Sequence, residues 1–499
     1  MKKTIKIIRN YIGKYLLKFL IYAKKFDTFP IFVKFFPKST YKATHELLKR
    51  GYLNLAYETI KDYTPKEHEK HIKQRVLSMI EIRDNDIHML DNIALQKKKE
   101  INILFAVHNS LPYDKTGYAI RTHAIVTQFH KKNISLVVAT RPGYPWDLQK
   151  YRNLPFKKQD YIDSIEYIRL EDTNHSFKKG ADSNYINVYA NELIKLAKER
   201  KSTIIHANSN YLNAHAAIQA ANKLHIPSIY EIRGLWHLTR LTIDSLYKYN
   251  GMFEYEQKMV QTAAINATKV VVLSNAFKNL LISWGIEEQK ISVIPNAVDI
   301  SLFEPQKPCN ELIEKYKLQD RFVVGFIGSL TAYEGLEYLV KAVDELSLKY
   351  PISLVIVGDG KEKEKLQKIT NNQNIIFTGR VPHNEVKKYY SIFDVCAYPR
   401  TDDEVCRYIP PLKPLEAMSM QKAIIVSDVT PLLEMVDDKK TGLVCKTNNT
   451  ESLKQNIFKF YSDQKLKENL SYNARLWVEK NRNWKTISNK YITLYRECL

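Results

Sequence analysis

The sequence predicts two α/β domains in tandem, preceded by a helical extension. From about residue 101, short runs of β-branched and apolar residues alternate with stretches of helical periodicity. This pattern is typical of doubly wound, mostly parallel sheets. The alternation pauses near residue 300 and then restarts, which indicates a second sheet. Two such domains that face each other are expected to bind a ligand beyond the carboxyl ends of their strands.

The first segment, residues 1–40, is basic and aromatic. At about 100° per residue its apolar residues fall on one side and several lysines on the other. Such a helix is typical of segments that lie on an anionic membrane surface; the alternative is a helix packed on the protein's own body. The apolar side comprises Ile12, Leu16, Phe19, Leu20 and Ala23, and the basic side comprises Lys14, Lys18 and Lys25.

The second segment, residues 41–98, has helical spacing in "HELLKRGYLNLAYETIKDY" and again after Pro65. No second copy of this pattern exists, so we interpret it as a helical extension rather than a repeat.

The two predicted domains cover residues 99–300 and 301–499, and a return of the last helix to the first domain is left open. Strands are expected at "INILFAVH", "ISLVVAT", "TIIHA", "SIYEI", "KVVVLS" and "ISVIP" in the first domain. In the second domain they are expected at "FVVGFIG", "SLVIVGD", "NIIFTG", "VCAYP", "AIIVS" and "GLVC".

The composition restricts the class of partner. The chain has 76 Lys and Arg against 54 Asp and Glu, a net charge of +22, which favours anionic lipid, nucleotides or nucleic acid. A dedicated nucleic-acid binder is disfavoured because no module of that kind is recognisable. The five cysteines form no CxxC pair and no zinc spacing, so we expect free thiols in a reducing cytoplasm. We expect neither a secretory signal nor a membrane span.

Two loops of the second domain carry candidate ligand-binding residues. In "FIGSLTAYEGLEYLVKAV", Gly328 and Ser329 end a strand and Gly335 opens a helix. Such a turn lets backbone N–H groups approach a phosphate, although a tight turn without a ligand has the same pattern.

The second loop is "YPRTDDEVCRYIPPLKPLEAMSM". Arg400, Arg407 and Lys413 suit a diphosphate, and the Glu416 carboxylate suits two ribose hydroxyls. The alternative for Glu416 is a favourable interaction with the helix dipole.

The second domain resembles the sugar-nucleotide domain of the large retaining glycosyltransferase family four, which has the GT-B fold of two Rossmann-like domains. The resemblance rests on "VIVGDG", "FTGRVPHNEV" and "PLKPLEAM…AIIVSDVTPLLEMVDDKKTGLVC". It implies a nucleoside-diphosphate sugar donor and no metal cofactor, with UDP preferred because of its frequency in the family. The second carboxylate of the family's Glu-x7-Glu pair is Glu416, and the backbone near Val381 would meet the base.

Two departures from the family pattern concern charge. Tyr408 stands at the first position of the Glu-x7-Glu pair, and the usual Arg and Lys positions fall near Ser329 and Glu334. The loop is similar to a subgroup with YEGL and PLKPLEAM that builds bacterial surface polysaccharides. Our hypothesis is that the missing positive charge, and hence catalytic stabilisation of the leaving diphosphate, comes from Arg400, Arg407 and Lys413.

The first domain resembles the same subgroup in "HNSLPYDKTGYAIRTHAIVTQF". The resemblance implies that Gly117 lets the backbone close over the donor. It also implies that Tyr118, Arg121, His206 and Arg233 contact the sugar or the acceptor, although His206 is nearly as well explained as a structural residue.

The sequence therefore predicts a retaining hexosyltransferase of capsule, lipopolysaccharide or related polysaccharide synthesis. We expect it at the cytoplasmic membrane face, acting on a glycan or lipid-linked acceptor and binding no nucleic acid. The alternatives are a sugar-nucleotide 2-epimerase of the same fold and a non-catalytic partner subunit.

Overall fold

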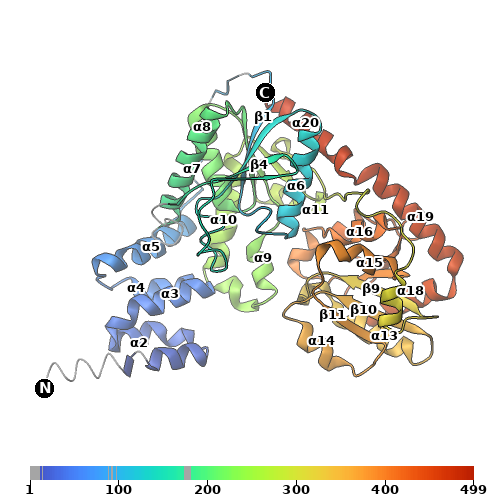
Figure 1. The fold of residues 1–499 in the computed structure, drawn as a ribbon. Coiled ribbons are helices and arrows are strands. Elements are labelled where there is room, and N and C mark those ends of the chain that lie inside the picture. The colour runs from blue at the N-terminus through green and yellow to red at the C-terminus, as the bar shows by residue number, and fades with distance from the viewer. Residues whose placement is uncertain (1–11, 14, 88, 92–93, 97, 173–180) are drawn as a thin grey trace.

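The computed structural model describes residues 12–13, 15–87, 89–91, 94–96, 98–172 and 181–499. Figure 1 shows two α/β domains and a helical extension that projects from the first of them. The fold class predicted from the sequence, two parallel-sheet domains of the GT-B type with N-terminal helices, is confirmed.

The N-terminal domain is built on a sheet that, within the described residues, has eight strands in the order β3-β4-β2-β1-β5-β6-β7-β8. All neighbouring strands are parallel except β3 and β4, which form an antiparallel pair at one edge. The strands are β1 (Asn102–Val107), β2 (Ser135–Thr140), β3 (Gln159–Ile162), β4 (Ile165–Arg169), β5 (Ile204–Asn208), β6 (Ser228–Glu231), β7 (Lys269–Val272) and β8 (Ile291–Val293).

Helices cover both faces of this sheet because its strands are apolar on both sides, as in β1 and β5, where nearly every residue is buried. The helices are α6 (Gly117–His130), α7 (Asp182–Glu199), α8 (Tyr211–Leu224), α9 (Trp236–Leu241), α10 (Met252–Asn266) and α11 (Asn275–Ser283). The short 3-10 helices are η5 (Ser245–Tyr249) and η6 (Glu288–Lys290).

The C-terminal domain contains a parallel sheet that, in the part of the chain described, has six strands in the order β11-β10-β9-β12-β13-β14. They are β9 (Phe322–Ile327), β10 (Ile352–Val357), β11 (Ile375–Gly379), β12 (Val395–Tyr398), β13 (Ala423–Ser427) and β14 (Leu443–Cys445). The helices are α12 (Asn310–Lys315), α13 (Leu336–Ser347), α14 (Lys363–Ile369), α15 (Val386–Ser391), α16 (Lys413–Ser419), α17 (Thr430–Leu433), α18 (Thr450–Ser462) and α19 (Gln464–Asn481). The 3-10 helices are η7 (Ala332–Glu334), η8 (His383–Glu385) and η9 (Glu404–Arg407).

The last helix, α20 (Trp484–Cys498), returns to the N-terminal domain and packs on α6 (Figure 1). Its Tyr491 and Tyr495 are fully buried in the same apolar cluster as Phe105 of β1 and Phe129 of α6. The chain thus crosses between the domains twice, once after β8 and once before α20.

The extension consists of η1 (Phe26–Thr28), α2 (Phe29–Phe35), η2 (Pro37–Ser39), α3 (Thr40–Arg50), α4 (Leu53–Ile60), η3 (Glu67–Glu69) and α5 (Lys70–Asp84). It docks on the N-terminal domain through α5, which packs on α10, and Lys258 donates to the carbonyl of Arg83 at 3.1 Å. Residues 1–11 and Lys14 of the predicted basic amphipathic segment lie outside the described residues. Within the described ranges, no helix has the length and apolarity that a bilayer span requires.

Each strand expected from the sequence is present, but the β3–β4 hairpin was not predicted. The strand β3 is four residues long, and its one buried residue is Asp160, which is polar. Its apolar signal is therefore too weak to separate it from a loop, and pairing with β4 at the sheet edge decides its conformation.

Substitution of Gly335 would show how tightly the turn between η7 and α13 is packed. Its φ of +67° is left-handed, and an added Cβ would lie 1.9 Å from the carbonyl oxygen of Pro399. Gly285 has a similar φ of +85° with open space around it. We expect Gly285→Ala to lower the free energy of unfolding by about 1–2 kcal/mol, and Gly335→Ala to lower it by about 1–3 kcal/mol more because it also overpacks. Urea denaturation measures both; equal losses would show that the turn relaxes freely.

Candidate functional site

The turn after β9 places a lysine of α16 beside a glycine. An added Cβ at Gly328 would lie 2.1 Å from Cε and 2.3 Å from Nζ of Lys413. Only a glycine therefore leaves room for this ammonium group at the end of β9, and Ser329 beside it is exposed.

Two of the three cations predicted from the sequence converge on one buried carboxylate. Lys413 Nζ lies 2.9 Å from Glu334 Oε1, and Arg400 Nε lies 3.7 Å from Glu334 Oε2. Burial alone would raise the pKa of Glu334, but Lys413 and Arg400 overcome this effect and lower it. The group of two cations and one carboxylate keeps a net positive charge at this turn.

Arg407 does not join this group. Its guanidinium is half exposed and forms a bidentate pair with Asp402 at 2.8 Å for each bond. The structure thus brings Arg400 and Lys413 together at the turn that lacks the family's usual cations, and it holds the third cation outside.

Glu416 lies three residues after Lys413 on α16, and its Oε2 accepts a hydrogen bond of 3.0 Å from the hydroxyl of Tyr390. Burial raises the pKa of Glu416 to about 7, against the opposing effects of Tyr390 and Lys413. The carboxyl group therefore changes its charge near neutral pH, which is unusual for glutamate. Its second oxygen is free to accept hydrogen bonds from a ligand.

The N-terminus of α6 faces this edge from the other domain. An added Cβ at Gly117, the first residue of α6, would lie 3.1 Å from Cδ1 of Leu412, the residue before Lys413. The side chain of Thr116, the N-cap residue, makes no capping hydrogen bond. The first-turn N–H groups of α6 are therefore available to an anion. Tyr118 follows, with its hydroxyl directly over Gly234.

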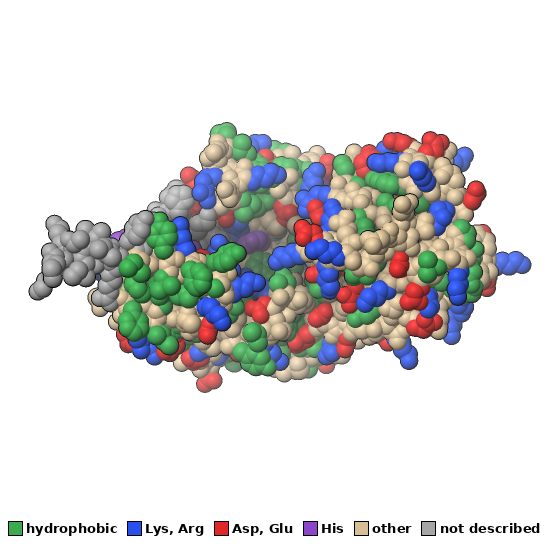
Figure 2. Space-filling model, turned by 90° about the horizontal axis from the view of Figure 1, so that it is seen from below, with side chains coloured by type: hydrophobic (Ala, Val, Ile, Leu, Met, Phe, Trp, Pro, Cys, Tyr) green, Lys and Arg blue, Asp and Glu red, His purple; other side chains and the backbone are tan. Residues whose placement is uncertain are grey.

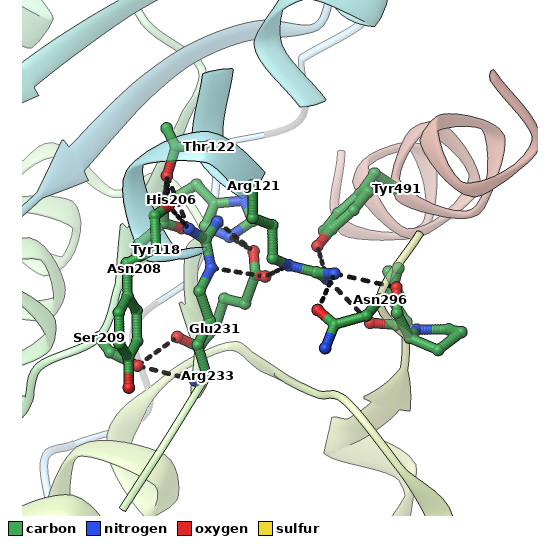
Figure 3. Close-up of polar contacts among 12 residues, drawn as sticks. Tyr118, Arg121, Thr122, His206, Asn208, Ser209, Glu231, Arg233, Asn296 and Tyr491 are labelled. Carbon is green, nitrogen blue, oxygen red and sulfur yellow. Dashed lines mark hydrogen bonds and ion pairs between the residues drawn. The ribbon is translucent and has the colours of Figure 1, made fainter. Parts of the chain in front are cut away.

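A buried polar cluster supports this helix from behind (Figure 3). Glu231, at the end of β6, pairs with Arg121 at 2.8 Å, Arg233 at 2.9 Å and His206 at 3.0 Å. The two arginines overcome the effect of burial and hold the pKa of Glu231 well below its usual range. Burial and the same arginines lower the pKa of His206, which leaves it neutral and the cluster with a net positive charge.

Arg233 links the cluster to the first turn of α6. Its Nη1 donates to the carbonyl of Tyr118 at 2.8 Å and to Thr122 Oγ1 at 2.6 Å (Figure 3). Asn208, at the end of β5, donates to the same Thr122 hydroxyl at 3.1 Å. The orientation of the α6 N-terminus is therefore fixed by two strand ends.

Arg121 ties the same cluster to both domain crossings. It donates to the carbonyls of Ile294 and Pro295 and to Asn296 Oδ1, each at 3.0 Å, and to Tyr491 of α20 at 2.8 Å. Asn296 in turn donates to the carbonyl of Pro410 in the C-terminal domain at 2.9 Å. One side chain thus connects α6, the strand end, the linker and the returning helix.

Arg121, His206 and Arg233 were predicted from the sequence to contact sugar or acceptor, and the structure places all three in the interior instead. Every side-chain nitrogen of Arg121 is hydrogen-bonded to protein, and so is every one of Arg233. His206 is fully buried between Glu231 and the hydroxyl of Tyr495 at 2.7 Å. We therefore assign all three a positioning role. Gly117, Tyr118, Gly328, Ser329, Lys413 and Glu416 lie at the facing edges, and Val381 is half-buried just beyond β11.

Among the residues that the structure describes, no group of three or more His, Cys, Asp or Glu side chains is arranged to share a metal ion. Metal independence stays a prediction.

Two Rossmann-like domains whose strand ends face each other form the GT-B fold. Residues 116–302 match the family described as Glycosyltransferase Family 4, and residues 310–477 match that described as Glycosyl transferases group 1. Together they account for most of the chain beyond the extension. The chain belongs to glycosyltransferase family 4.

Similar proteins agree with this assignment. An uncharacterized glycosyltransferase of Methanocaldococcus jannaschii is 27% identical over 258 residues, 51% of this chain and 64% of that protein. The capsular polysaccharide biosynthesis glycosyltransferase CapM of Staphylococcus aureus is 23% identical over 323 residues, 61% of this chain and 80% of that protein. The solved structure of HepE from Anabaena in complex with UDP has a TM-score of 0.61 at 17% identity and covers 80% of this chain and 100% of that chain.

Removal of Arg121 should destabilise the protein far more than removal of an exposed arginine. Arg121→Ala leaves Glu231 with one fewer buried partner and frees the linker, so we expect a loss of about 3–5 kcal/mol in the free energy of unfolding. Arg407→Ala, which breaks only the exposed pair with Asp402, should cost about 0–1 kcal/mol. Urea denaturation of both variants makes the comparison, and similar losses would contradict a central role for Arg121.

Proposed function

We propose that the chain is a retaining hexosyltransferase that moves a sugar from a UDP donor to a glycan or lipid-linked acceptor in surface-polysaccharide synthesis. The observation that carries the proposal is the meeting of the uncapped N-terminus of α6 with the loop of Lys413 and Glu416 across the two domains. Anion-binding elements from two domains that converge in this way suit a diphosphate.

The names and ligands of similar proteins support the proposed substrate class. The solved neighbours include HepE in complex with UDP-glucose and an apo lipopolysaccharide outer core galactosyltransferase, WaaB. CapM is named for capsular polysaccharide biosynthesis. These activities and this ligand, together with the cationic turn, favour a UDP-hexose and a surface glycan over other substrates.

The chemistry follows from where charge develops. Cleavage of the bond between the anomeric carbon and the diphosphate leaves negative charge on the leaving phosphate. Lys413, with Arg400 behind it, and the N–H groups of α6 are fixed where they would stabilise that charge. In a retaining transfer the acceptor hydroxyl attacks from the same face, and the leaving phosphate takes its proton. This route needs no carboxylate pair of the kind that hydrolases use.

Glu416 would accept hydrogen bonds from the two ribose hydroxyls as a carboxylate. Its pKa of about 7 in the free protein is above the unfolded value, so the protonated form stabilises the fold. That contribution is fully present below the unfolded pKa near 4.5 and is lost as pH rises through 7. The pH dependence of donor binding has the opposite sign, because the donor binds the ionised form of Glu416.

Ionisation of Glu416 should make the affinity for UDP depend on pH. We expect UDP affinity to fall as pH drops below 7. At pH 6, UDP binding should release close to one proton more in the wild type than in Glu416→Gln, measured by calorimetry in buffers of different ionisation enthalpy. The difference isolates Glu416, because the terminal phosphate of UDP itself titrates with a pKa of about 6. Glu416→Gln should also weaken UDP binding by about 10- to 100-fold, the value of one or more hydrogen bonds to a charged group.

Radiolabelled UDP-sugars test the proposal as a whole. Transfer or slow hydrolysis by the wild type, lost in Glu416→Gln, supports a transferase. Conversion to the 2-epimer would favour the epimerase, and binding without turnover would favour a non-catalytic subunit. UDP binding that is indifferent to both pH and the substitution would overturn the role of Glu416.

We further propose that the extension holds the protein on an anionic membrane surface. In the described part, residues 12–13 and 15–22 are helical, and Leu17 is buried against the rest of the extension. Phe19 is 61% and Tyr22 87% exposed, although both are large and apolar. Figure 2 shows hydrophobic side chains gathered on the extension with lysines and arginines among them. A mixed apolar and basic surface of this kind suits an anionic lipid interface.

Charge introduced on this face should release the protein from membranes. In sedimentation with vesicles containing anionic lipid, the double variant Phe19→Asp and Tyr22→Asp should show a severalfold smaller bound fraction than the wild type, because it loses apolar insertion and adds repulsion. Tyr249→Asp, at a tyrosine 74% exposed in the N-terminal domain, is the matched control and should bind like the wild type. Equal binding of all three proteins would overturn the anchoring proposal.

A further inference from the structure

A cavity of about 190 Å³ lies between the extension and the N-terminal domain. Its wall includes Arg75 of α5, Asp182 of α7, Tyr211 of α8, and Trp236 and Arg240 of α9, and His108 follows β1. His108, Tyr211 and Trp236 follow the carboxyl ends of β1, β5 and β6, where ligands of parallel sheets bind. The cavity is smaller than sites for drug-sized ligands. Its size suits a single sugar ring better than a nucleotide.

The extension completes this cavity. The HepE structure is covered in full by 80% of this chain, so a fifth of this chain has no counterpart there. Arg75 comes from the extension and reaches Asp182 Oδ1 at 3.1 Å. Asp182 also accepts a hydrogen bond of 2.7 Å from Tyr255, which fixes the carboxylate. One wall of the cavity is therefore supplied by a segment outside both family matches.

The charges that line the cavity are already paired. Arg75 pairs with Asp182, and Arg240 pairs with Glu256 at 3.1 Å. Two cations and two carboxylates leave no surplus of either sign to recognise a free anion or cation. Planar groups in such pairs still offer donors and acceptors at their edges, and these match the adjacent hydroxyls of a sugar.

Two residues of the cavity wall each have a buried nitrogen atom without a protein partner in the part of the chain described, namely Arg75 Nε and His108 Nδ1. Buried polar atoms without a partner are costly, so a turn of either side chain toward a ligand group in the cavity would be favourable. Burial and the nearby Arg141 keep the pKa of His108 well below its usual range. A neutral imidazole can accept from or donate to a hydroxyl.

The remaining wall is aromatic. The Trp236 ring stands edge-on to His108, with ring centroids 5.5 Å apart and planes at 79°. Tyr211 makes a similar contact with Tyr255 at 6.3 Å and 86°. Aromatic rings beside fixed polar groups suit a ligand with an apolar face and a hydroxylated rim, which is the shape of a pyranose.

We propose that this cavity binds one neutral pyranose ring of the acceptor and that the extension supplies part of its specificity through Arg75. This inference rests on the proposed function. Trp236 connects the cavity to the donor edge, because it lines the cavity and its helix α9 packs against η9 of the C-terminal domain. A sugar held in the cavity would therefore sit beside the place where the donor sugar is expected.

The experiment uses the full chain saturated with UDP and a panel of methyl glycosides of neutral hexoses and N-acetylhexosamines. Binding is followed by saturation-transfer NMR and titration. We expect at least one glycoside to bind the wild type and Arg75→Ala to weaken it about tenfold, equivalent to about 1.4 kcal/mol. Arg83→Ala is the matched control, because Arg83 lies on the same helix and forms its own pair with Asp84 but does not line the cavity. Affinity for UDP should be unchanged in both variants.

The outcomes separate the two proposals. If UDP fails to bind the wild type, the proposed function fails and this inference with it. If UDP binds but no glycoside does, or if Arg75→Ala binds glycosides as well as Arg83→Ala does, the cavity inference alone is overturned. Displacement of the glycoside by inorganic phosphate at the same site would also overturn it, because it would show an anion site.

Discussion

The ionised carboxylate of Glu231, buried at the end of β6, is the constraint on which the domain arrangement depends. A buried charge is tolerated only when it is paired and hydrogen-bonded, and here two arginines and a histidine do so. Because Arg121 continues to the linker and to Tyr491, the same cluster decides where the C-terminal domain starts and where the chain returns. The buried ion pairs of Glu231 thus help to position the facing edges of the two domains, which carry the candidate site.

At the turn after β9, the positive charge comes from a different part of the sequence than in the family pattern but lies at the same place in the fold. Glu334 stands where the family pattern leads one to expect a cation, and Lys413 and Arg400 approach it from the loop after β12. The cations then lie at the same turn, with Gly328 leaving room for the lysine. A carboxylate inserted between two cations also fixes their geometry, and preorganised charge is what stabilisation of a leaving diphosphate requires.

The extension joins two otherwise separate aspects of the protein. Its outer face carries exposed aromatic side chains beside lysines, while its α5 helix closes a sugar-sized cavity with Arg75. The contacts of α5 with α10 and α7 therefore relate the proposed membrane surface to the proposed acceptor wall. An acceptor presented at a membrane would meet both in a fixed geometry, which lowers the entropy cost of orienting it.

The sequence by itself determined the fold class, the positions of the strands other than β3 and β4, and the loops that meet, because buried parallel strands leave strong apolar runs and the loop motifs are local. It placed Glu416, Lys413 and Gly117 at the facing edges, but it could not separate Arg400 from Arg407 or show that Arg121 and His206 face inward. Nor could it find Arg75 and His108, since nothing local distinguishes an arginine on an amphipathic helix. Several of those distinctions depend on partners that are distant in the sequence, such as Tyr491 for Arg121 and Asp182 for Arg75. Only tertiary packing decides which partner each side chain meets.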